Sequence, residues 1–263
     1  MKSLRSLILM VAMTFSCAPF ANTLLSDMSD LWWIPTESGW GVTVTHQGDI
    51  AFLTFFIYGQ DGKAAWYTGQ AAYTGKNSGG AYIFTGPVYQ VAGPWFGTST
   101  FNPNLVTVRQ AGTVTFTAFL NAATLAYAID GVSVTKNVVR QTFRNNDMTG
   151  DYMGAMKSTQ SGCRSLFDNG DFNDSVEYSV TSSATNFSMR VTQLDRSTCT
   201  YTGNYVQSGR FGSSEGTYTC TRGATGTYQV VELEAGISGF TGRYAASDNF
   251  CTAITGRFAA MRK

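Results

Sequence analysis

The chain has 263 residues, enough for one large β domain or for two domains of about 120 residues each. Charged residues make up only 13%, about half the usual share, whereas 14% are aromatic and 28 residues are glycine. This composition predicts an all-β fold. The net charge of +1, with no basic stripe, argues against nucleic-acid binding.

Residues 1–21 predict a secretory signal peptide. Lys2 and Arg5 precede an apolar segment from Leu7 to Phe15, which is too short to span a membrane. We expect cleavage after Ala21, which leaves 16 basic and 17 acidic residues. Cys17 offers lipidation as a weaker alternative, because the residues before it form a poor lipobox. The mature protein is expected to be soluble and secreted or periplasmic, without a membrane span.

The segment from Trp40 to Tyr73 predicts a β-meander. Apolar and small polar residues alternate from Trp40 to His46, with Trp40, Val42, Val44 and His46 on one face. Glycine-containing turns at Gly48 and Gly62 separate this strand from the next two. The middle strand, from Ile50 to Tyr58, is apolar on both faces, so we expect both faces to be covered.

A motif surrounds the first strand of this meander. It reads Trp33-x-Pro35-x-Glu37-Ser38-Gly39-Trp40-Gly41, followed by Gln47-Gly48-Asp49, an aromatic strand and Trp66. The motif resembles a module that recurs in secreted proteobacterial proteins of uncharacterised function, although Ile34 stands where that module commonly has Asn. The resemblance covers the first half of the chain well and implies an exported β protein. It implies no catalytic residue.

The rest of the first half predicts further short strands with hairpin-length connections. They are expected at 80–90, 105–110, 113–120, 124–129 and 132–143, separated by turn residues such as Ala111-Gly112. A domain boundary is expected at Asn145 to Asp147, because all five tryptophans precede it and the four cysteines of the mature chain follow it. Seven more strands are expected beyond it, near 176–181, 186–193, 198–207, 216–221, 226–234, 239–245 and 252–261.

We therefore predict two consecutive antiparallel meander domains, at 31–144 and 149–263. Each is expected to be a barrel or a sandwich, in the style of lipocalins and avidin. The first domain is rich in tryptophan, and the second is expected to be cross-linked by disulfides.

Four cysteines in an exported domain imply two disulfides. The segments around Cys199 and Cys220 mirror each other about a Gly209 to Gly212 turn, so a hairpin would place the two cysteines opposite each other at a distance that a disulfide tolerates. Elimination then leaves Cys163 with Cys251. A metal site is a poor alternative, because the cysteines lack metal-ligand spacing, and we expect no metal and no cofactor.

The aromatic residues of the first half are the candidate ligand-binding residues. Aromatic rings suit sugars and small apolar molecules, and their alternative role is to plug the barrel. We expect Trp40 and Trp66 in the core, and Trp32, Trp33 and Trp95 to be exposed. The full candidate set is Trp32, Trp33, Glu37, Trp40, Tyr58, Trp66, Tyr67 and Trp95.

The remaining polar candidates have simple structural explanations. Glu37 could be a polar group at a cleft or a turn residue that satisfies backbone donors, and the second role is favoured. The single histidine, His46, is expected to make an ordinary hydrogen bond. The oxygen-rich stretch from Asp168 to Asp174 lacks the spacing of an EF-hand and is expected to be a turn.

These observations predict a non-enzymatic module that binds a glycan or a small apolar molecule. The alternative is a structural or adhesive surface protein, and a third candidate is a hydrolase that uses Glu37 with Asp49 or Asp61. Tryptophans that surround a cavity would favour the ligand-binding module, whereas tryptophans in an outward patch would favour adhesion. The oligomeric state is left open.

Overall fold

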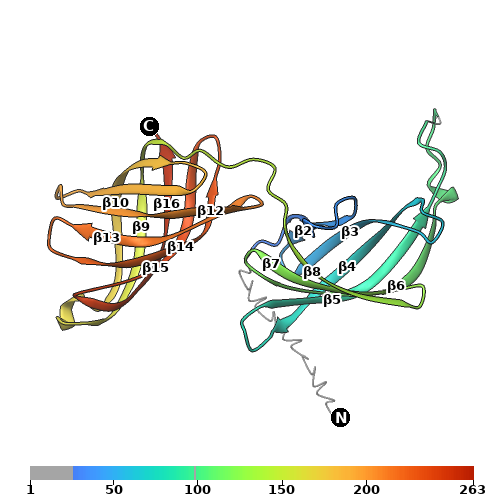
Figure 1. Cartoon of the computed structure of the whole chain (residues 1–263), viewed down its shortest axis with the longest axis horizontal. Coiled ribbons are helices and arrows are strands. Elements are labelled where there is room, and N and C mark those ends of the chain that lie inside the picture. Colours follow the sequence, from blue (N-terminus) through green and yellow to red (C-terminus); the bar gives the residue numbers. More distant parts are fainter. Residues whose placement is uncertain (1–25, 98) are drawn as a thin grey trace, which may run out of the picture.

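Hydrogen bonding closes the chain into two separate barrels in the computed structural model, which describes residues 26–97 and 99–263 (Figure 1). Each barrel has eight antiparallel strands in sequence order, and its first strand pairs with its last. The all-β prediction is therefore confirmed, with barrels in place of sandwiches. The predicted signal peptide lies outside the described residues.

The first barrel precedes residue 141. Its strands are β1 (Asp30–Trp33), β2 (Gly41–Gln47), β3 (Ile50–Tyr58), β4 (Ala64–Lys76), β5 (Tyr82–Ala92), β6 (Thr107–Phe119), β7 (Ala122–Ile129) and β8 (Val132–Arg140). Large apolar side chains with no exposed surface fill its interior, namely Trp32, Leu53, Phe55, Phe84, Phe116 and Leu125. Side chains of this size pack an eight-stranded barrel without leaving a channel.

The second barrel begins at residue 150. Its strands are β9 (Gly150–Cys163), β10 (Gly170–Ser182), β11 (Asn186–Gln193), β12 (Thr198–Ser208), β13 (Phe211–Cys220), β14 (Thr225–Ala235), β15 (Gly239–Asp248) and β16 (Cys251–Arg262). Tyrosines supply much of its interior, among them Tyr152, Tyr178, Tyr205, Tyr218, Tyr228 and Tyr244. The described residues also include two short 3₁₀ turns, Pro103–Leu105 and Leu166–Asp168, and no helix among them is long and apolar enough to cross a bilayer.

No strand was predicted at β1, and two further strand predictions are wrong. The turn expected at Ala111-Gly112 is part of the continuous strand β6, which passes a register shift opposite Val88 and Tyr89. A side chain at Gly112 would overlap the Ala128 carbonyl. This glycine therefore allows β6 and β7 to pair closely, and it does not form a turn. The whole of β9 was missed, because Gly154 and Ser158 on its inward face interrupt the apolar alternation that starts at Tyr152.

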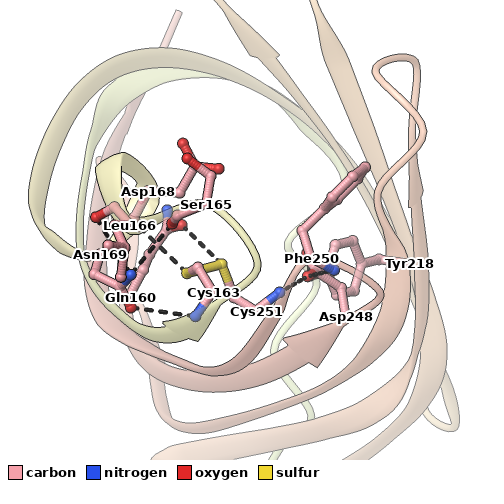
Figure 2. Close-up of a disulfide and its surroundings, with 10 residues drawn as sticks. All are labelled: Gln160, Cys163, Ser165, Leu166, Asp168, Asn169, Tyr218, Asp248, Phe250 and Cys251. Atoms are coloured by element: carbon pink, nitrogen blue, oxygen red, sulfur yellow. Dashed lines mark hydrogen bonds between the residues drawn. A yellow bond between two sulfur atoms is a disulfide. The ribbon is translucent and has the colours of Figure 1, made fainter.

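The two disulfides are the pairs that the sequence predicts, and both lie at one end of the second barrel. Cys199 is directly opposite Cys220 in the β12–β13 pair, as the mirrored sequence implies. Cys163–Cys251 joins β9 to β16, where the barrel closes (Figure 2).

Asp248 lies beside the Cys163–Cys251 disulfide. It accepts hydrogen bonds from the backbone N–H of Cys251, at 2.7 Å, and from the Tyr218 hydroxyl, at 2.7 Å. Two disulfides indicate an oxidising, extracytoplasmic environment.

The turn between β12 and β13 contacts one end of the first barrel. The backbone N–H of Gly209 donates to Thr142 Oγ1 at 2.9 Å, and the N–H of Arg210 donates to Asp30 Oδ2 at 3.1 Å. The Arg140 guanidinium lies 4.5 Å from the Trp32 ring centroid and also covers the ring of Phe211 in the second barrel. We call this end of the first barrel the docked end.

Arg140 is the central residue of this contact. It is only 3% exposed, and its Nη1 donates to Asp30 Oδ2 at 3.1 Å. Its other N–H groups donate to the carbonyl oxygens of Asp27, Ser29 and Leu120. A buried guanidinium needs partners of this kind, because an unpaired buried charge is costly. The opposite end of the first barrel, where β2 begins and β3 ends, is called the distal end, and the outer face of β2, β3 and β4 carries the candidate site.

Candidate functional site

Four large side chains form an aromatic face on the outside of the first barrel, namely Phe52, Phe56, Tyr58 and Trp66. They are 44%, 38%, 58% and 52% exposed, respectively. Strand alternation explains their direction, because Leu53 on β3 faces the packed interior and its neighbours in sequence must then face outward. The expectation that β3 is covered on both faces is therefore wrong.

The aromatic face is ordered in rows across the strands. Phe56 on β3 lies directly opposite Trp66 on β4, and Phe52 lies directly opposite Gln70. Between them runs a row of hydroxyl side chains formed by Thr43, Thr54 and Thr68. None of these residues is charged. The face therefore offers aromatic rings together with hydroxyl and amide groups that donate and accept hydrogen bonds.

The glycines of the Trp33 to Gly41 motif make room for this face. A side chain at Gly41 would place its Cβ 2.6 Å from Phe56 Cζ, so the Phe56 ring lies across the bare backbone of β2. Gly39 has a φ of +116°, and its carbonyl accepts a hydrogen bond from the Tyr58 hydroxyl at 2.8 Å. The motif thus fixes the position of two aromatic rings.

Glu37 connects the motif to the last strand of the barrel. It accepts hydrogen bonds from Trp40 Nε1 at 3.0 Å and from Lys136 Nζ at 2.8 and 3.0 Å. The Lys136 hydrogen bonds hold the pKa of the Glu37 carboxyl below its ordinary value. Burial raises the pKa of the neighbouring Tyr127 hydroxyl. The favoured role of Glu37 needs correction, because the carboxylate holds two side chains and does not satisfy backbone donors.

Two tryptophans face the opposite way from the prediction. Trp32, expected to be exposed, is fully buried and donates from Nε1 to the Met28 carbonyl at 3.0 Å. Trp66, expected in the core, is part of the outer aromatic face. In each pair of neighbours one side chain faces inward and the other outward, because a shift of one residue moves a side chain to the other face of a strand. Tyr67 is therefore buried and Trp33 is only half-buried.

The other aromatic candidates lie at the distal end. Trp40 is half-buried and packs against the core, as predicted. Trp95 is exposed, also as predicted, in the connection between β5 and β6, and its ring centroid lies 5.7 Å from that of the exposed Phe96. This connection projects away from the second barrel (Figure 1). Tyr58 and Trp66 are thus the candidates that the structure brings together, and Trp95 is on a separate loop.

His46 lies at the docked end with its side chain 5% exposed. Its Nδ1 accepts a hydrogen bond from the Met28 N–H at 3.3 Å, and its ring packs edge-on against Phe84. Desolvation by burial lowers the pKa of the imidazole. The histidine therefore has the ordinary hydrogen bond that we predicted.

The carboxylates proposed for a hydrolase do not converge. Asp49 follows β2 at the end opposite Glu37, and the seven residues of β2 span roughly 20 Å, well beyond a glycosidase pair. Asp61 forms an exposed ion pair with Lys63 at 3.3 Å. The stretch from Asp168 to Asp174 forms a 3₁₀ turn and the start of β10. The described residues contain no group of three or more side chains placed to hold a metal ion.

Sequence reasoning missed two members of the aromatic face. Phe52 and Phe56 were assigned to a covered strand, because a continuous apolar run does not reveal which face is exposed. The signal that would have found them is Gly41, which pairs with Phe56 in the β2–β3 register and has no side chain to cover the ring. A glycine inside a strand often marks such a close approach.

The comparisons with known proteins identify no function. No family model matches the chain, and no curated protein matches it. One solved structure that it resembles is a protein of unknown function from the DUF3598 family of Nostoc punctiforme. The similarity covers 90% of this chain and 94% of that one, with 7% sequence identity and a TM-score of 0.23.

Proposed function

We propose that this protein is an exported, non-enzymatic module that binds neutral glycans on the aromatic face of its first barrel. The observation that carries the proposal is the alternation of rows on β2, β3 and β4, with Phe56 and Trp66 on one side of a threonine row and Phe52 and Gln70 on the other. Rings stack on the apolar faces of sugars, and hydroxyl and amide groups bond to sugar hydroxyls.

A small apolar ligand inside the first barrel has less support. Its interior is occupied by Trp32, Phe55 and Phe116, none of which has any exposed surface. An exposed row of rings on the outside suits an extended ligand that lies along the barrel. Export is supported by the two disulfides and by the resemblance of the Trp33 to Gly41 motif to a module of secreted proteins.

Affinity electrophoresis in gels that contain soluble neutral polysaccharides, such as xyloglucan or hydroxyethylcellulose, tests this function. At least one polysaccharide should retard the protein, and Trp66→Ala should weaken its retardation about fivefold, since loss of one ring contact of about 1 kcal/mol lowers affinity by about that factor. Phe119→Ala is the matched control, because Phe119 is 51% exposed on β6, outside the aromatic face. Retardation that Trp66→Ala and Phe52→Ala leave unchanged would refute the proposal.

Adhesion to another protein is the second candidate, and the β5–β6 connection favours it. Residues 91–106 contain no charged side chain, and Trp95, Phe96 and Phe101 are all exposed there. Apolar side chains of this kind form the centres of protein interfaces. Light scattering of the mature protein separates the two functions. Self-association that Phe96→Ser abolishes would support adhesion, and a monomer that binds polysaccharide would support the glycan module.

A further inference from the structure

A row of three positively charged side chains crosses the outside of the second barrel. Lys157 on β9 is directly opposite Arg257 on β16, and Arg257 is directly opposite Arg243 on β15. All three point outward, because the adjacent residues Ser158 and Phe258 are buried inside the barrel. Like charges placed opposite each other on neighbouring strands destabilise a sheet.

The barrel compensates only part of this charge. Glu232 lies at a register shift in β14 with a φ of 52°, and its carboxylate is 3.3 Å from Arg257 Nη2 and 2.9 Å from Arg243 Nη2. The same carboxylate also accepts a hydrogen bond from the Ser26 hydroxyl. The side chain of Lys157 has no ion pair or hydrogen bond to any residue that the structure describes. One shared carboxylate therefore faces three cations.

The row is a local concentration of charge and not a property of the whole barrel. Residues 149–263 contain ten basic and ten acidic side chains, so this half of the chain is balanced. Two other basic residues of this barrel are paired one to one, Arg222 with Asp195 and Lys263 with Glu177. What distinguishes the row is that its three cations lie directly opposite one another on β9, β16 and β15, whereas Arg190 on β11 lies opposite Ser179 and Thr200.

A groove of about 430 Å³ lies beside the row. Small and amide side chains line it next to the cations, namely Thr159, Thr255, Ala245 and Gln229. Three of these, Thr255, Ala245 and Gln229, also line a second groove of about 840 Å³, so the two are continuous. The second groove adds hydroxyl and amide groups from Thr217, Thr227, Ser247 and Asn204, and it contains one carboxylate, that of Glu215.

We propose that this continuous groove binds a saccharide with one acidic sugar, whose carboxylate lies on the cationic row. The guanidinium of arginine presents a planar fork of N–H donors that matches a carboxylate, and Lys157 adds a charge with no competing partner. Neutral sugars extend over the hydroxyl-lined groove, where Glu215 would repel a second acid. This site is separate from the aromatic face and does not depend on the function proposed for it.

The test compares two disaccharides that differ in one carboxylate, cellobiouronic acid and cellobiose, by isothermal titration calorimetry on the mature protein at low salt. The acid should bind at least about tenfold more tightly than the neutral sugar. Lys157→Gln should weaken binding of the acid about fivefold, and Glu232→Gln should strengthen it, because it removes the competing carboxylate. Arg190→Gln is the matched control, since Arg190 is an exposed cation on β11 that lines neither groove.

Three results would overturn the proposal. The first is equal affinity for the two disaccharides, and the second is binding of the acid that Lys157→Gln leaves unchanged. The third is binding of inorganic sulfate as tight as that of the acid, which would reveal a site for free anions. Trp66→Ala should leave acid binding intact, so loss of the aromatic face and loss of this site are distinguishable.

Discussion

Gly41 gives the aromatic face its shape, because the Phe56 ring occupies the space where a side chain at this position would lie. Gly41→Ala must displace that ring or the Trp32 carbonyl, whose oxygen is 3.0 Å from the added Cβ. We expect a loss of about 1–3 kcal/mol in the free energy of unfolding, measured by urea titration. In a Phe56→Ala background the loss should shrink, and an equal loss in both backgrounds would contradict this explanation. Gly93→Ala is the control, because its Cβ meets only Val106 at 3.4 Å.

His46 makes stability depend on pH, since burial lowers the pKa of the imidazole below its ordinary value of 6.5. The unfolded chain therefore takes up a proton before the folded protein does. Stability should be complete above about pH 7, decrease as the pH falls through 6.5, and level off below the pKa of the folded protein. Urea unfolding from about pH 8 to about pH 5 measures this effect.

The chain has a single histidine, so no second imidazole titrates in this range. His46→Gln should accordingly flatten the profile between about pH 5 and about pH 7. A profile that keeps its slope in this variant would assign the effect to other groups.

Individual side-chain directions were the least predictable property of this protein. Trp32 and Trp33 are adjacent in one strand, so one must face inward and one outward, and their sequence does not say which. The register with β2 and β8 decides the question, and that register depends on residues more than 100 positions away, such as Arg140. Predictions of burial that rest on residue type alone were therefore wrong for Trp32 and Trp66.

At the scale of elements, local patterns predicted hairpins well and isolated strands poorly. The β12–β13 pair was predicted to the residue, because Cys199-x-Tyr201 and Tyr218-x-Cys220 mirror each other about a short turn. In contrast, β9 closes the barrel by pairing with its last strand, β16, and no turn joins these two strands in sequence. Gly154 and Ser158 interrupt the apolar residues Tyr152 and Met156 on its inward face, so no clear alternation marked it as a strand.

The two disulfides should differ in how much they stabilise the second barrel. Cys163–Cys251 spans 88 residues and Cys199–Cys220 spans 21. The loop-entropy model gives about 4.5 and about 3 kcal/mol, respectively. Guanidinium unfolding of the two double-alanine variants should show the larger loss for the barrel-closing pair. Equal losses, or the reverse order, would show that loop entropy does not govern the difference.

At the scale of the whole molecule, the composition change at Asn145 to Asp147 located the passage between the barrels but did not reveal their contact. That contact joins Asp30 near the start of the described chain to Arg210, which is 180 residues away. Such a pair leaves no trace in local sequence patterns. The β12–β13 turn was predicted only as a hairpin turn, whereas its Gly209 also packs against Asp30 and Arg140 of the first barrel.

Gly209 should therefore control whether the two barrels act as one unit. It has a φ of +59°, and a Cβ there would overlap the Asp30 carboxylate, which also binds Arg140. Gly209→Ala should lower the stability of the intact protein and separate thermal unfolding into two calorimetric transitions, one for each barrel. It should also make the connection around residue 145 more sensitive to proteolysis.

Gly223→Ala provides the matched control for this variant. Gly223 has a φ of +87° in the turn between β13 and β14, but nothing lies within 4 Å of its added Cβ. This control carries the backbone strain of about 1–2 kcal/mol without the clash between barrels. It should shift the second barrel's stability and keep a single cooperative transition. Identical behaviour of the two variants would mean that the contact through Asp30 and Arg140 does not couple the barrels.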